Sequence, residues 1–452
     1  MTLVDRVLAV RDRVAVLTPR AQSLALYLPV LVIAALVRLI NLGSPKALVF
    51  DEIYYVRDAW TMWNLGYEAQ WEATANFSTG HTSDFLDRAV FIAHPPLGKW
   101  LIGAGMALFG PNNSFGWRFS VALAGIAVVA LTIAIAAKLF HSKFAAALAG
   151  LIVALDGVAI TMSRTALLDG FLAMFVLAAF LVILNHLDHP GWGQWLILAG
   201  LLLGAACAVK WSGLYALAAF TLWVIIARRS IAPLLMTPIA VVVYLASWTG
   251  WLLSSKGYDR GSVVIESNPV GSALASLWDY HQAIYTYNIG LTTPHGYMAN
   301  PFGWLLLIRP TAFYYEPNCG DGCTQYITSV ANPIYWYLGV IALGVLIALM
   351  IRTRSHLEVG IPILIGVAAT YLPWLAFSHR TVFQFYTVTL EPFLALAAVW
   401  WLVYLWRRGW ETFVVGIVGI GVIVAAFFLP VWMGFPIPTW FAAAHYWFPT
   451  WI

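Results

Sequence analysis

Charged residues are scarce in this chain of 452 residues, where they make up 10% of the sequence against 62% hydrophobic residues. Soluble domains carry about 25% charged residues, so the composition excludes an ordinary soluble protein and predicts an integral membrane protein. The apolar runs are about 20 residues long, which favours membrane-spanning helices over the short alternating strands of a β-barrel. The net charge of +4 comes from residues placed by membrane topology, so it does not indicate a nucleic-acid partner.

Cysteine is also rare, with three residues in the chain. Cys207 lies in an apolar run, whereas Cys319 and Cys323 flank three residues of a polar loop. The loop pair is interpreted as a small disulfide in an oxidising exterior. The alternative is a pair of metal ligands, but the other two ligands of such a site are not apparent. No spacing such as HxxxH is present, so neither a metal site nor a cofactor is predicted.

Internal repeats, low-complexity tracts and soluble domains are missing too, so residues 1–452 are read as one polytopic membrane domain. A cleavable signal peptide is not expected, because arginines lead into a first apolar run without a small-residue cleavage site. The candidate spans are the apolar runs 21–42, 97–110, 116–137, 144–162, 166–186, 193–209, 211–227, 231–253, 333–351, 357–377, 383–404 and 411–432.

Short basic loops decide how many of these runs cross the membrane. The loops are Lys138/His141/Lys143, Arg228/Arg229, Arg352/Arg354 and Arg407/Arg408. Basic loops stay in the cytoplasm, and run 97–110 is too short to span untilted. If that run is interfacial or re-entrant, eleven spans put every basic loop and the N-terminus inside. The C-terminus, the first loop 43–115 and the long loop 254–332 then lie outside.

Two adjacent carboxylates, Asp51 and Glu52, follow the first apolar run and precede a run of helical periodicity over 53–65. A carboxylate here can cap that helix or stand in a solvated loop. The alternative is functional, because like-charge repulsion and partial burial raise the pKa of one carboxylate and make it a general base. An acidic pair beside a bilayer is costly unless it faces water, a partner or a reaction.

Cations stand at the outer ends of several spans, namely Arg118, Arg164, Lys210 and Arg380. Such residues can snorkel to the interface or pair with a carboxylate, for which Asp169 is available near Arg164. Lys210 is harder to explain this way, because it interrupts an otherwise apolar stretch. Several cations above a lipid layer form a cradle for a phosphate.

Histidine contributes two candidates at the same outer face, His94 and His379. Either could bind a metal, but neither belongs to an Asp/His cluster. A hydrogen-bonding role at the edge of a site is therefore the favoured interpretation.

Motifs in chain order resemble those of the protein O-mannosyltransferases, and the resemblance runs nearly end to end. The motifs are Asp51-Glu52, His94-Pro95-Pro96-Leu97-Gly98-Lys99, Ser163-Arg164-Thr165-Ala166-Leu167-Leu168-Asp169, Val209-Lys210-Trp211-Ser212-Gly213-Leu214, and His379-Arg380 with the aromatic stretch to Tyr386. The resemblance implies the GT-C glycosyltransferase fold, an all-α membrane protein of eleven spans whose extracytoplasmic loops carry the active site.

The chain departs from the family pattern at two places. The loop 254–332 is too short for the β-trefoil domain of the eukaryotic members, and Gln384-Phe385-Tyr386-Thr387 replaces a histidine-rich stretch. Both departures favour a bacterial, actinobacterial type of member.

What the resemblance implies is inverting transfer of mannose from polyprenyl-phosphate mannose to Ser or Thr hydroxyls of translocated proteins. Asp51 then acts as the general base, and Glu52 is the second member of the catalytic pair. The substrate-binding residues implied are Arg118, Arg164, Asp169, Lys210, His379, Arg380, His94, Lys99 and Tyr386. No metal or cofactor is implied, because cations alone can neutralise a phosphate leaving group.

The expected partners are the lipid-linked donor, a Ser/Thr-containing secreted polypeptide delivered through the Sec translocon, and the bilayer of the plasma membrane. One alternative is another GT-C transferase, which moves a different sugar from polyprenyl phosphate to a lipid or a cell-wall glycan. A second alternative is a transporter or flippase of lipid-linked substrates. The latter is disfavoured, because polar groups cluster at the outer span ends and no inverted repeat is seen.

Overall fold

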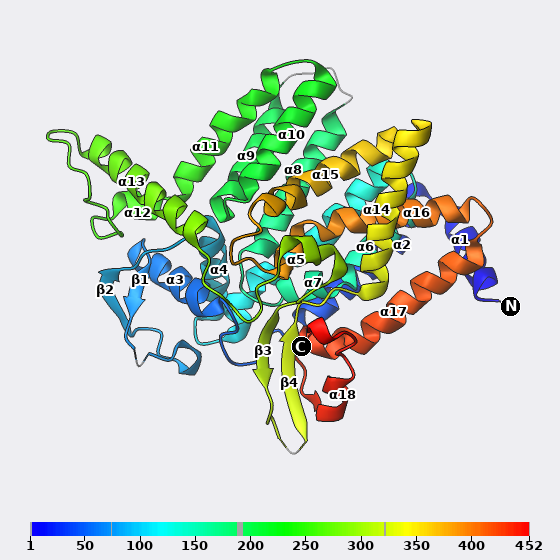
Figure 1. The fold of residues 1–452 in the computed structure, drawn as a ribbon, viewed down its shortest axis with the longest axis horizontal. Helices are drawn as coiled ribbons and strands as arrows, with labels where there is room; N and C mark the ends of the chain where they lie inside the picture. Colours follow the sequence, from blue (N-terminus) through cyan, green and yellow to red (C-terminus); the bar gives the residue numbers. More distant parts are fainter. Residues whose placement is uncertain (1, 74, 188–192, 321, 452) are drawn as a thin grey trace.

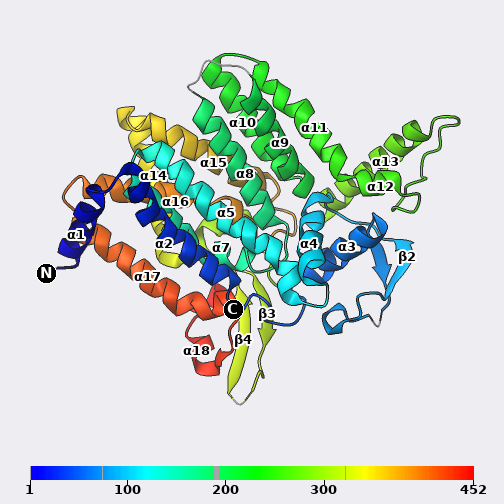
Figure 2. The same ribbon diagram turned by 180° about the vertical axis from the view of Figure 1, so that it is seen from behind.

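Long helices form one bundle in the computed structural model, which describes residues 2–73, 75–187, 193–320 and 322–451 (Figure 1, Figure 2). The bundle helices are α2 (Pro19–Leu39), α5 (Ser114–Phe140), α6 (Lys143–Ala154), α8 (Asp169–His186), α9 (Gln194–Val209), α10 (Gly213–Arg228), α11 (Met236–Ser247), α14 (Pro333–Thr353), α15 (Leu357–Ala376), α16 (Glu391–Trp406) and α17 (Glu411–Met433).

Shorter elements surround the bundle. The helices are α1 (Leu3–Ala15), α3 (Glu52–Leu65), α4 (Leu97–Phe109), α7 (Gly157–Met162), α12 (Thr249–Leu253), α13 (Pro269–Gly290) and α18 (Thr439–Ala443), with 3-10 turns at Phe77–Thr79, Ala232–Leu235, Pro301–Leu306, Gln384–Thr389 and Pro449–Trp451. The strands are β1 (Ala69–Trp71), β2 (Phe85–Ala89), β3 (Ala312–Glu316), β4 (Cys323–Thr328) and β5 (Ile437–Pro438).

The strands form two small antiparallel sheets, β1-β2 and β3-β4-β5. Tyr315 pairs with Tyr326 in the β3–β4 hairpin, and Cys323 pairs with Pro438 of β5. A disulfide between Cys319 and Cys323 closes the hairpin, which confirms the predicted bond. The long loop 254–332 therefore holds a helix and a hairpin.

Six helices among the described residues are long and apolar enough to cross a membrane, namely α2, α5, α8, α14, α15 and α17. Six shorter apolar helices accompany them, at Leu97–Phe109, Lys143–Ala154, Gln194–Val209, Gly213–Arg228, Ala232–Ser247 and Glu391–Trp406. Every predicted apolar run overlaps one of these helices, so a mostly helical membrane protein is confirmed, although the described residues also form two small sheets that the all-α prediction did not include. The number of eleven crossings stays a prediction.

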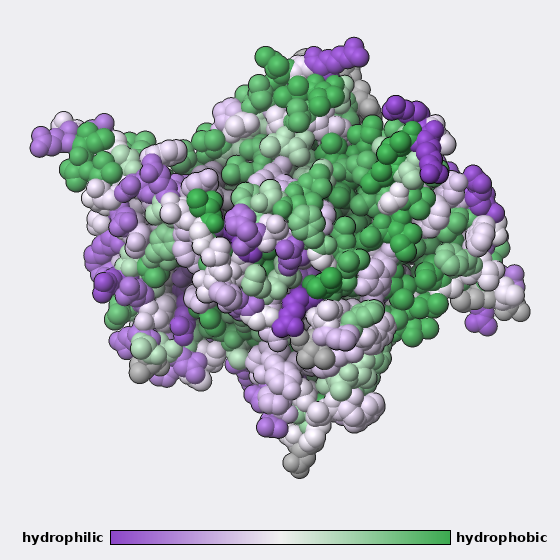
Figure 3. Space-filling model, viewed as in Figure 1, coloured by the Kyte–Doolittle hydropathy of each residue, from purple (hydrophilic) through white to green (hydrophobic). Residues whose placement is uncertain are grey.

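Apolar side chains cover much of the outer surface of the bundle (Figure 3). Among them, Leu222 is 58% exposed, Ile226 67% and Ile423 69%. A protein in water would not leave so many large apolar side chains uncovered on helix faces. Lipid contact explains this surface.

The run 144–162 is two helices rather than one, because the chain breaks between α6 and α7. The carboxylate of Asp156 accepts hydrogen bonds from the backbone N–H groups of Val158 at 2.8 Å and Asn332 at 2.9 Å. The guanidinium of Arg38 donates to the carbonyl of Ala154 at 3.4 Å. These bonds satisfy backbone groups that the break leaves open.

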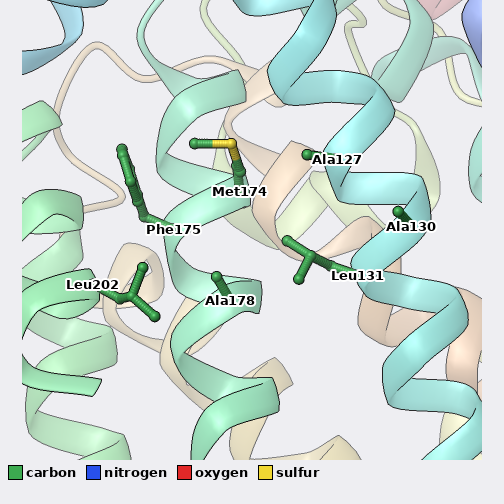
Figure 4. A pocket seen from close by; sticks show the side chains of 7 residues that line it. All are labelled: Ala127, Ala130, Leu131, Met174, Phe175, Ala178 and Leu202. Carbon is green, nitrogen blue, oxygen red and sulfur yellow. The ribbon is translucent and has the colours of Figure 1, made fainter. Parts of the chain in front are cut away.

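An apolar hollow of about 440 Å³ lies between α5, α8 and α9 (Figure 4). Its lining residues are Ala127, Ala130, Leu131, Met174, Phe175, Ala178 and Leu202. The small alanine side chains leave the space, and the lining offers nothing to a charged group. The hollow therefore suits a hydrocarbon chain and lacks the polar groups that a catalytic site needs.

Candidate active site

Asp51 stands at the turn into α3. It occupies the N-cap position, but its side chain makes no capping hydrogen bond, so capping does not explain it. The residue before it, Phe50, has a φ of 49° and packs on Phe313 and Phe383, with ring centroids 5.1 and 5.4 Å away. A bulky residue holds this left-handed conformation only where its surroundings fix it. Aromatic packing thus fixes the turn that carries Asp51.

The Asp51 carboxylate lies in the field of a buried ion pair. Lys210 Nζ donates to both carboxylate oxygens of Asp169, at 2.9 and 3.1 Å. The same Nζ lies 3.7 Å from the centroid of the Tyr386 ring. Burial raises the pKa of Asp51 to about 6, Lys210 opposes the rise and Asp169 adds to it. Such a carboxylate is ionised at neutral pH and still basic enough to accept a proton.

The three partners come from helix ends that are distant in sequence. Asp169 is the first residue of α8, and Lys210 is the extended C-cap residue of α9. Tyr386 belongs to the 3-10 turn Gln384–Thr389, just before α16. Helix ends leave backbone groups and side chains free to face a site, because their last turns lack hydrogen-bond partners within the helix. The predicted residues Asp51, Asp169, Lys210 and Tyr386 are therefore brought together.

Tyr55 and His94 lie beside this group. Tyr55 is one helical turn after Asp51 and shares its face of α3. Burial raises the pKa of Tyr55, and the charge of Asp51 raises it further. The rings of Tyr55 and His94 are 6.0 Å apart, and burial and then Lys210 lower the pKa of His94. At neutral pH Tyr55 is a phenol and His94 a neutral imidazole, so each can donate a hydrogen bond.

Arg380 is a half-buried cation with donor capacity to spare. Its Nη2 donates to the Asn288 side-chain oxygen at 3.2 Å, and its guanidinium lies 5.9 Å from the Phe377 ring centroid. Its Nε is buried and has no hydrogen-bond partner among the described residues. Arg57 and Arg260 share this feature, so the free Nε makes Arg380 available to a ligand without identifying one. The neighbouring His379 is exposed.

A narrow hollow lies on the Lys210 side of α8, opposite the apolar hollow of Figure 4. Its lining residues are Leu172, Val176, Ser212, Tyr215, Ala216, Ala369, Thr370, Trp374 and Thr389. The Ser212 hydroxyl is buried without a partner in the described part of the chain. Asp51, Asp169, Lys210 and Arg380 are not among its lining residues, so this hollow lies near the candidate site and does not define it.

Glu52 and Arg118 are bonded to each other and do not face this site. Glu52 Oε1 accepts from Arg118 Nε and Oε2 from Nη2, both at 2.8 Å, and the side chains are 0% and 1% exposed. Backbone N–H groups of Val49 and Ala166 donate to the same carboxylate at 2.9 and 2.8 Å. The other Arg118 donors bind the carbonyls of Leu42, Pro45 and Ala47. These bonds favour structural roles for Glu52 and Arg118, whereas a catalytic Glu52 and a substrate-binding Arg118 stay predictions.

Arg164 is also used inside the protein. Its Nη2 donates to the carbonyls of Asn41 at 3.1 Å and Met433 at 3.2 Å. Its Nη1 donates to the carbonyls of Val37, Arg38 and Ile40. Arg164 thus joins the end of α2 to the end of α17, and its predicted role in substrate binding stays a prediction.

Lys99 lies in a second buried group beside the site. Its Nζ is 2.5 Å from Glu68 Oε1 and 3.5 Å from Asp58 Oδ2, and the Lys99 side chain is 1% exposed. Burial raises the pKa of Asp58, and Lys99 opposes the rise. Lys99 also lowers the pKa of His94 through its charge. Lys99 is therefore paired with carboxylates beside the site, and its predicted role in substrate binding stays a prediction.

Sequence reasoning missed Tyr55, Asn288 and the charged groups Arg38, Asp156 and Glu391. Tyr55 had a signal, because it lies four residues after Asp51 in a predicted helix. Asn288 had none, since its bond to Arg380 joins residues that are 92 apart in sequence. Charges inside apolar runs mark Arg38, Asp156 and Glu391. Arg38 and Asp156 bind backbone groups, whereas Glu391 Oε2 is buried without a hydrogen-bond partner among the described residues.

Comparison with known proteins identifies the family. Residues 29–253 match the family described as dolichyl-phosphate-mannose-protein mannosyltransferase. The polyprenol-phosphate-mannose–protein mannosyltransferase of Mycolicibacterium smegmatis is 31% identical, over 96% of this chain and 93% of that protein. The chain belongs to the protein O-mannosyltransferase family. The polyprenol-phosphate-mannose–protein mannosyltransferase of Mycobacterium tuberculosis is 30% identical, over 93% of this chain and 90% of that protein.

Solved structures show that this protein O-mannosyltransferase family member has the GT-C fold, as the sequence predicts. The Saccharomyces cerevisiae Pmt1-Pmt2 complex bound to its sugar donor matches with a TM-score of 0.75 at 14% identity, over 95% of this chain and 93% of that one. ArnT of Cupriavidus metallidurans bound to undecaprenyl phosphate matches with a TM-score of 0.57 at 19% identity, over 89% of this chain and 64% of that one.

Proposed function

We propose that this protein transfers mannose from polyprenyl-phosphate mannose to Ser or Thr hydroxyls of secreted proteins, with Asp51 as general base. Family membership supports the mannosyltransferase activity, because relatives aligned along most of the chain carry that name. The surroundings of its side chain carry the assignment of Asp51. The carboxylate makes no capping hydrogen bond to α3, burial raises its pKa to about 6, and the charges of the Lys210–Asp169 pair act on it.

The proposed reaction is a single displacement. The acceptor hydroxyl oxygen attacks the anomeric carbon from the face opposite the phosphate, and the bond from that carbon to the phosphate oxygen breaks. Asp51 takes the hydroxyl proton, and the electron pair of the broken bond leaves with polyprenyl phosphate. Attack from the opposite face inverts the configuration at that carbon. The base has to lie within hydrogen-bond reach of the hydroxyl, which an uncapped carboxylate at a helix start permits.

Cations are proposed to hold the donor phosphate and neutralise the charge that develops on it. Arg380 is the direct ligand in this proposal, because its Nε is buried without a partner among the described residues. Lys210 raises the local positive potential from its place over the Tyr386 ring. The Tyr55 phenol and the neutral His94 imidazole each keep a hydrogen-bond donor for sugar hydroxyls, and His379 keeps its predicted place at the edge of the site.

No cofactor enters the proposed step, since the cations supply what a phosphate leaving group needs. Within the described residues, no group of three or more His, Cys, Asp or Glu side chains is placed to hold a metal ion. The proposal therefore includes transfer in the presence of a chelator.

The proposed location is the plasma membrane, crossed eleven times, with the N-terminus in the cytoplasm and the active site and C-terminus outside. The basic loops support this orientation, because they lie on the same side as the N-terminal arginines only if α4 does not cross the membrane. The acceptor is proposed to arrive as an extended chain from the Sec translocon.

Transfer from radiolabelled polyprenyl-phosphate mannose to a Ser/Thr-rich peptide, with and without EDTA, tests the proposal. The expected result is labelled peptide at equal rates in both conditions. Label in an extracted lipid or glycan, with none in the peptide, would instead identify another GT-C transferase. Donor movement across a vesicle membrane without any transfer would identify a flippase.

A further inference from the structure

Helix α13 carries an exposed apolar stripe that the proposed chemistry does not use. Val270 is 69% exposed, Leu274 48%, Trp278 68%, Tyr285 58% and Ile289 42%. Their spacing of four or seven residues places all of them on one face of the helix. An apolar face along most of a 22-residue helix is too regular to be scattered surface residues.

The opposite face of α13 is firmly packed, so the exposed stripe does not reflect a loose helix. Tyr280 is 1% exposed and Ile284 0%, and both lie in a core cluster with Trp248, Trp251 and Ile92. The hydroxyl of Tyr280 accepts a hydrogen bond from the backbone N–H of Ile92 at 3.0 Å. The direction in which the stripe faces is therefore set by the fold.

A third face of α13 is polar. Asp279, Gln282 and Thr286 are exposed on the side of the apolar stripe that lies away from the packed face. A helix with one packed, one apolar and one polar face is suited to a boundary between hydrocarbon and water.

The occupant of the stripe follows from its continuity with the lipid-facing surface. Helix α11 exposes Val241 at 50% and Val242 at 66%, and Leu253 of α12, between α11 and α13, is 83% exposed. Both views show α13 projecting sideways from the end of α11, beyond the bundle (Figure 1, Figure 2). Tryptophan and tyrosine, which the stripe contains, are enriched at membrane interfaces.

We propose that α13 lies on the outer surface of the lipid bilayer, with this stripe in the boundary between head groups and acyl chains. The polar face then meets water, and the packed face joins the helix to the rest of the protein. The apolar face has no net charge to direct it to a charged partner, and a bilayer supplies hydrocarbon along its whole length.

The seating has a consequence for the candidate site. Asn288, in the last turn of α13, donates to the carbonyl of Ala93 at 3.3 Å and accepts from Arg380 at 3.2 Å. A helix held at the membrane surface thus fixes the height of Arg380, where a lipid-linked phosphate arrives. This consequence rests on the proposed function, whereas the proposed position of α13 on the membrane surface does not.

Site-directed spin labels in nanodiscs test the seating directly. Leu274→Cys places the label on the stripe, and Gln282→Cys is the matched control on the polar face. Cys207 is 3% exposed and the other cysteines form a disulfide, so the introduced thiol is the accessible one. Relaxation by oxygen, which enters lipid, and by a water-soluble nickel chelate reports the surroundings of each label without any need for activity.

The expected result is strong oxygen and weak nickel relaxation at position 274, with the reverse at 282. Equal nickel access at both positions would overturn the proposal, because the stripe would then face water. Exclusion of both reagents at 274 would also overturn it, because a protein partner or a second copy would then cover the stripe. Labelled variants that transfer mannose normally but fail this test separate the two proposals.

Discussion

Lys210 and Asp169, 41 residues apart in sequence, form a buried ion pair in which Nζ lies 2.9 and 3.1 Å from the two carboxylate oxygens. Both charges act on Asp51: Lys210 lowers the pKa of the Asp51 carboxyl group, and Asp169 raises it. The pair therefore tunes the proposed base without having to touch the acceptor.

The first prediction concerns the pH dependence of transfer. Asp51 accepts a proton only when ionised, and burial raises its pKa to about 6. Protonation removes the base, so kcat/KM should fall as the pH decreases through about 6, by about tenfold per pH unit below it. Initial rates with a Ser/Thr peptide between acidic and neutral pH measure this limb. A flat profile across that range would contradict the assignment.

The second prediction is that two variants shift the acid limb of the pH profile in opposite directions. Asp169→Asn removes a negative charge that raises the pKa of Asp51, so the acid limb should move to lower pH. Lys210→Met removes a positive charge that lowers this pKa, so the limb should move to higher pH. The same rate measurements check both variants. Shifts in one common direction would show that the limb belongs to another group.

The third prediction separates Glu52 from its neighbour. Glu52→Gln leaves the charge of Arg118 buried without its carboxylate, and breaking a buried pair costs about 3–5 kcal/mol. Thermal unfolding in detergent should therefore show a clear loss of stability. Glu266→Gln, at an exposed glutamate, is the control and should unfold like the wild type. A Glu52→Gln protein of unchanged stability that has lost transfer would mark Glu52 as catalytic after all.

The fourth prediction concerns donor binding. Arg380→Gln removes the buried Nε and its charge, and a charged hydrogen bond contributes about 1.5–3 kcal/mol, so donor affinity should fall about tenfold to hundredfold. Asn288→Ala removes the partner of Arg380 and should weaken binding less. Equilibrium binding of polyprenyl-phosphate mannose measures both, and Arg407→Gln in an exposed loop is the control. Equal affinity for Arg380→Gln and the control would exclude Arg380 as the phosphate ligand.

The helical membrane class could be predicted because hydrocarbon leaves few choices for a backbone, and each apolar run overlaps a helix. The helix break at Asp156 could not, since it depends on a bond to Asn332, which is 176 residues away. The disulfide between Cys319 and Cys323 could be predicted, because the two cysteines lie close together in a polar loop.

The charged residues of the site were predictable as a set and not one by one. Each of Arg118, Arg164 and Arg380 stands at an outer helix end in the sequence, yet only Arg380 has a buried nitrogen without a partner in the described structure. Arg118 and Arg164 bind carbonyl groups of loops, and nothing in a one-dimensional pattern says where carbonyls turn inward. Burial and pairing, which decide between structure and chemistry, are properties of the folded chain.

The most direct test of the account is mannose transfer by Asp51→Asn, measured together with donor binding. Asparagine keeps the size of the side chain and loses the base, so transfer should fall about 10²–10⁴-fold while donor affinity and thermal stability stay close to wild type. Asp259→Asn, at an exposed aspartate, is the control and should transfer normally. Unchanged transfer by Asp51→Asn would contradict the central claim, whatever the acceptor.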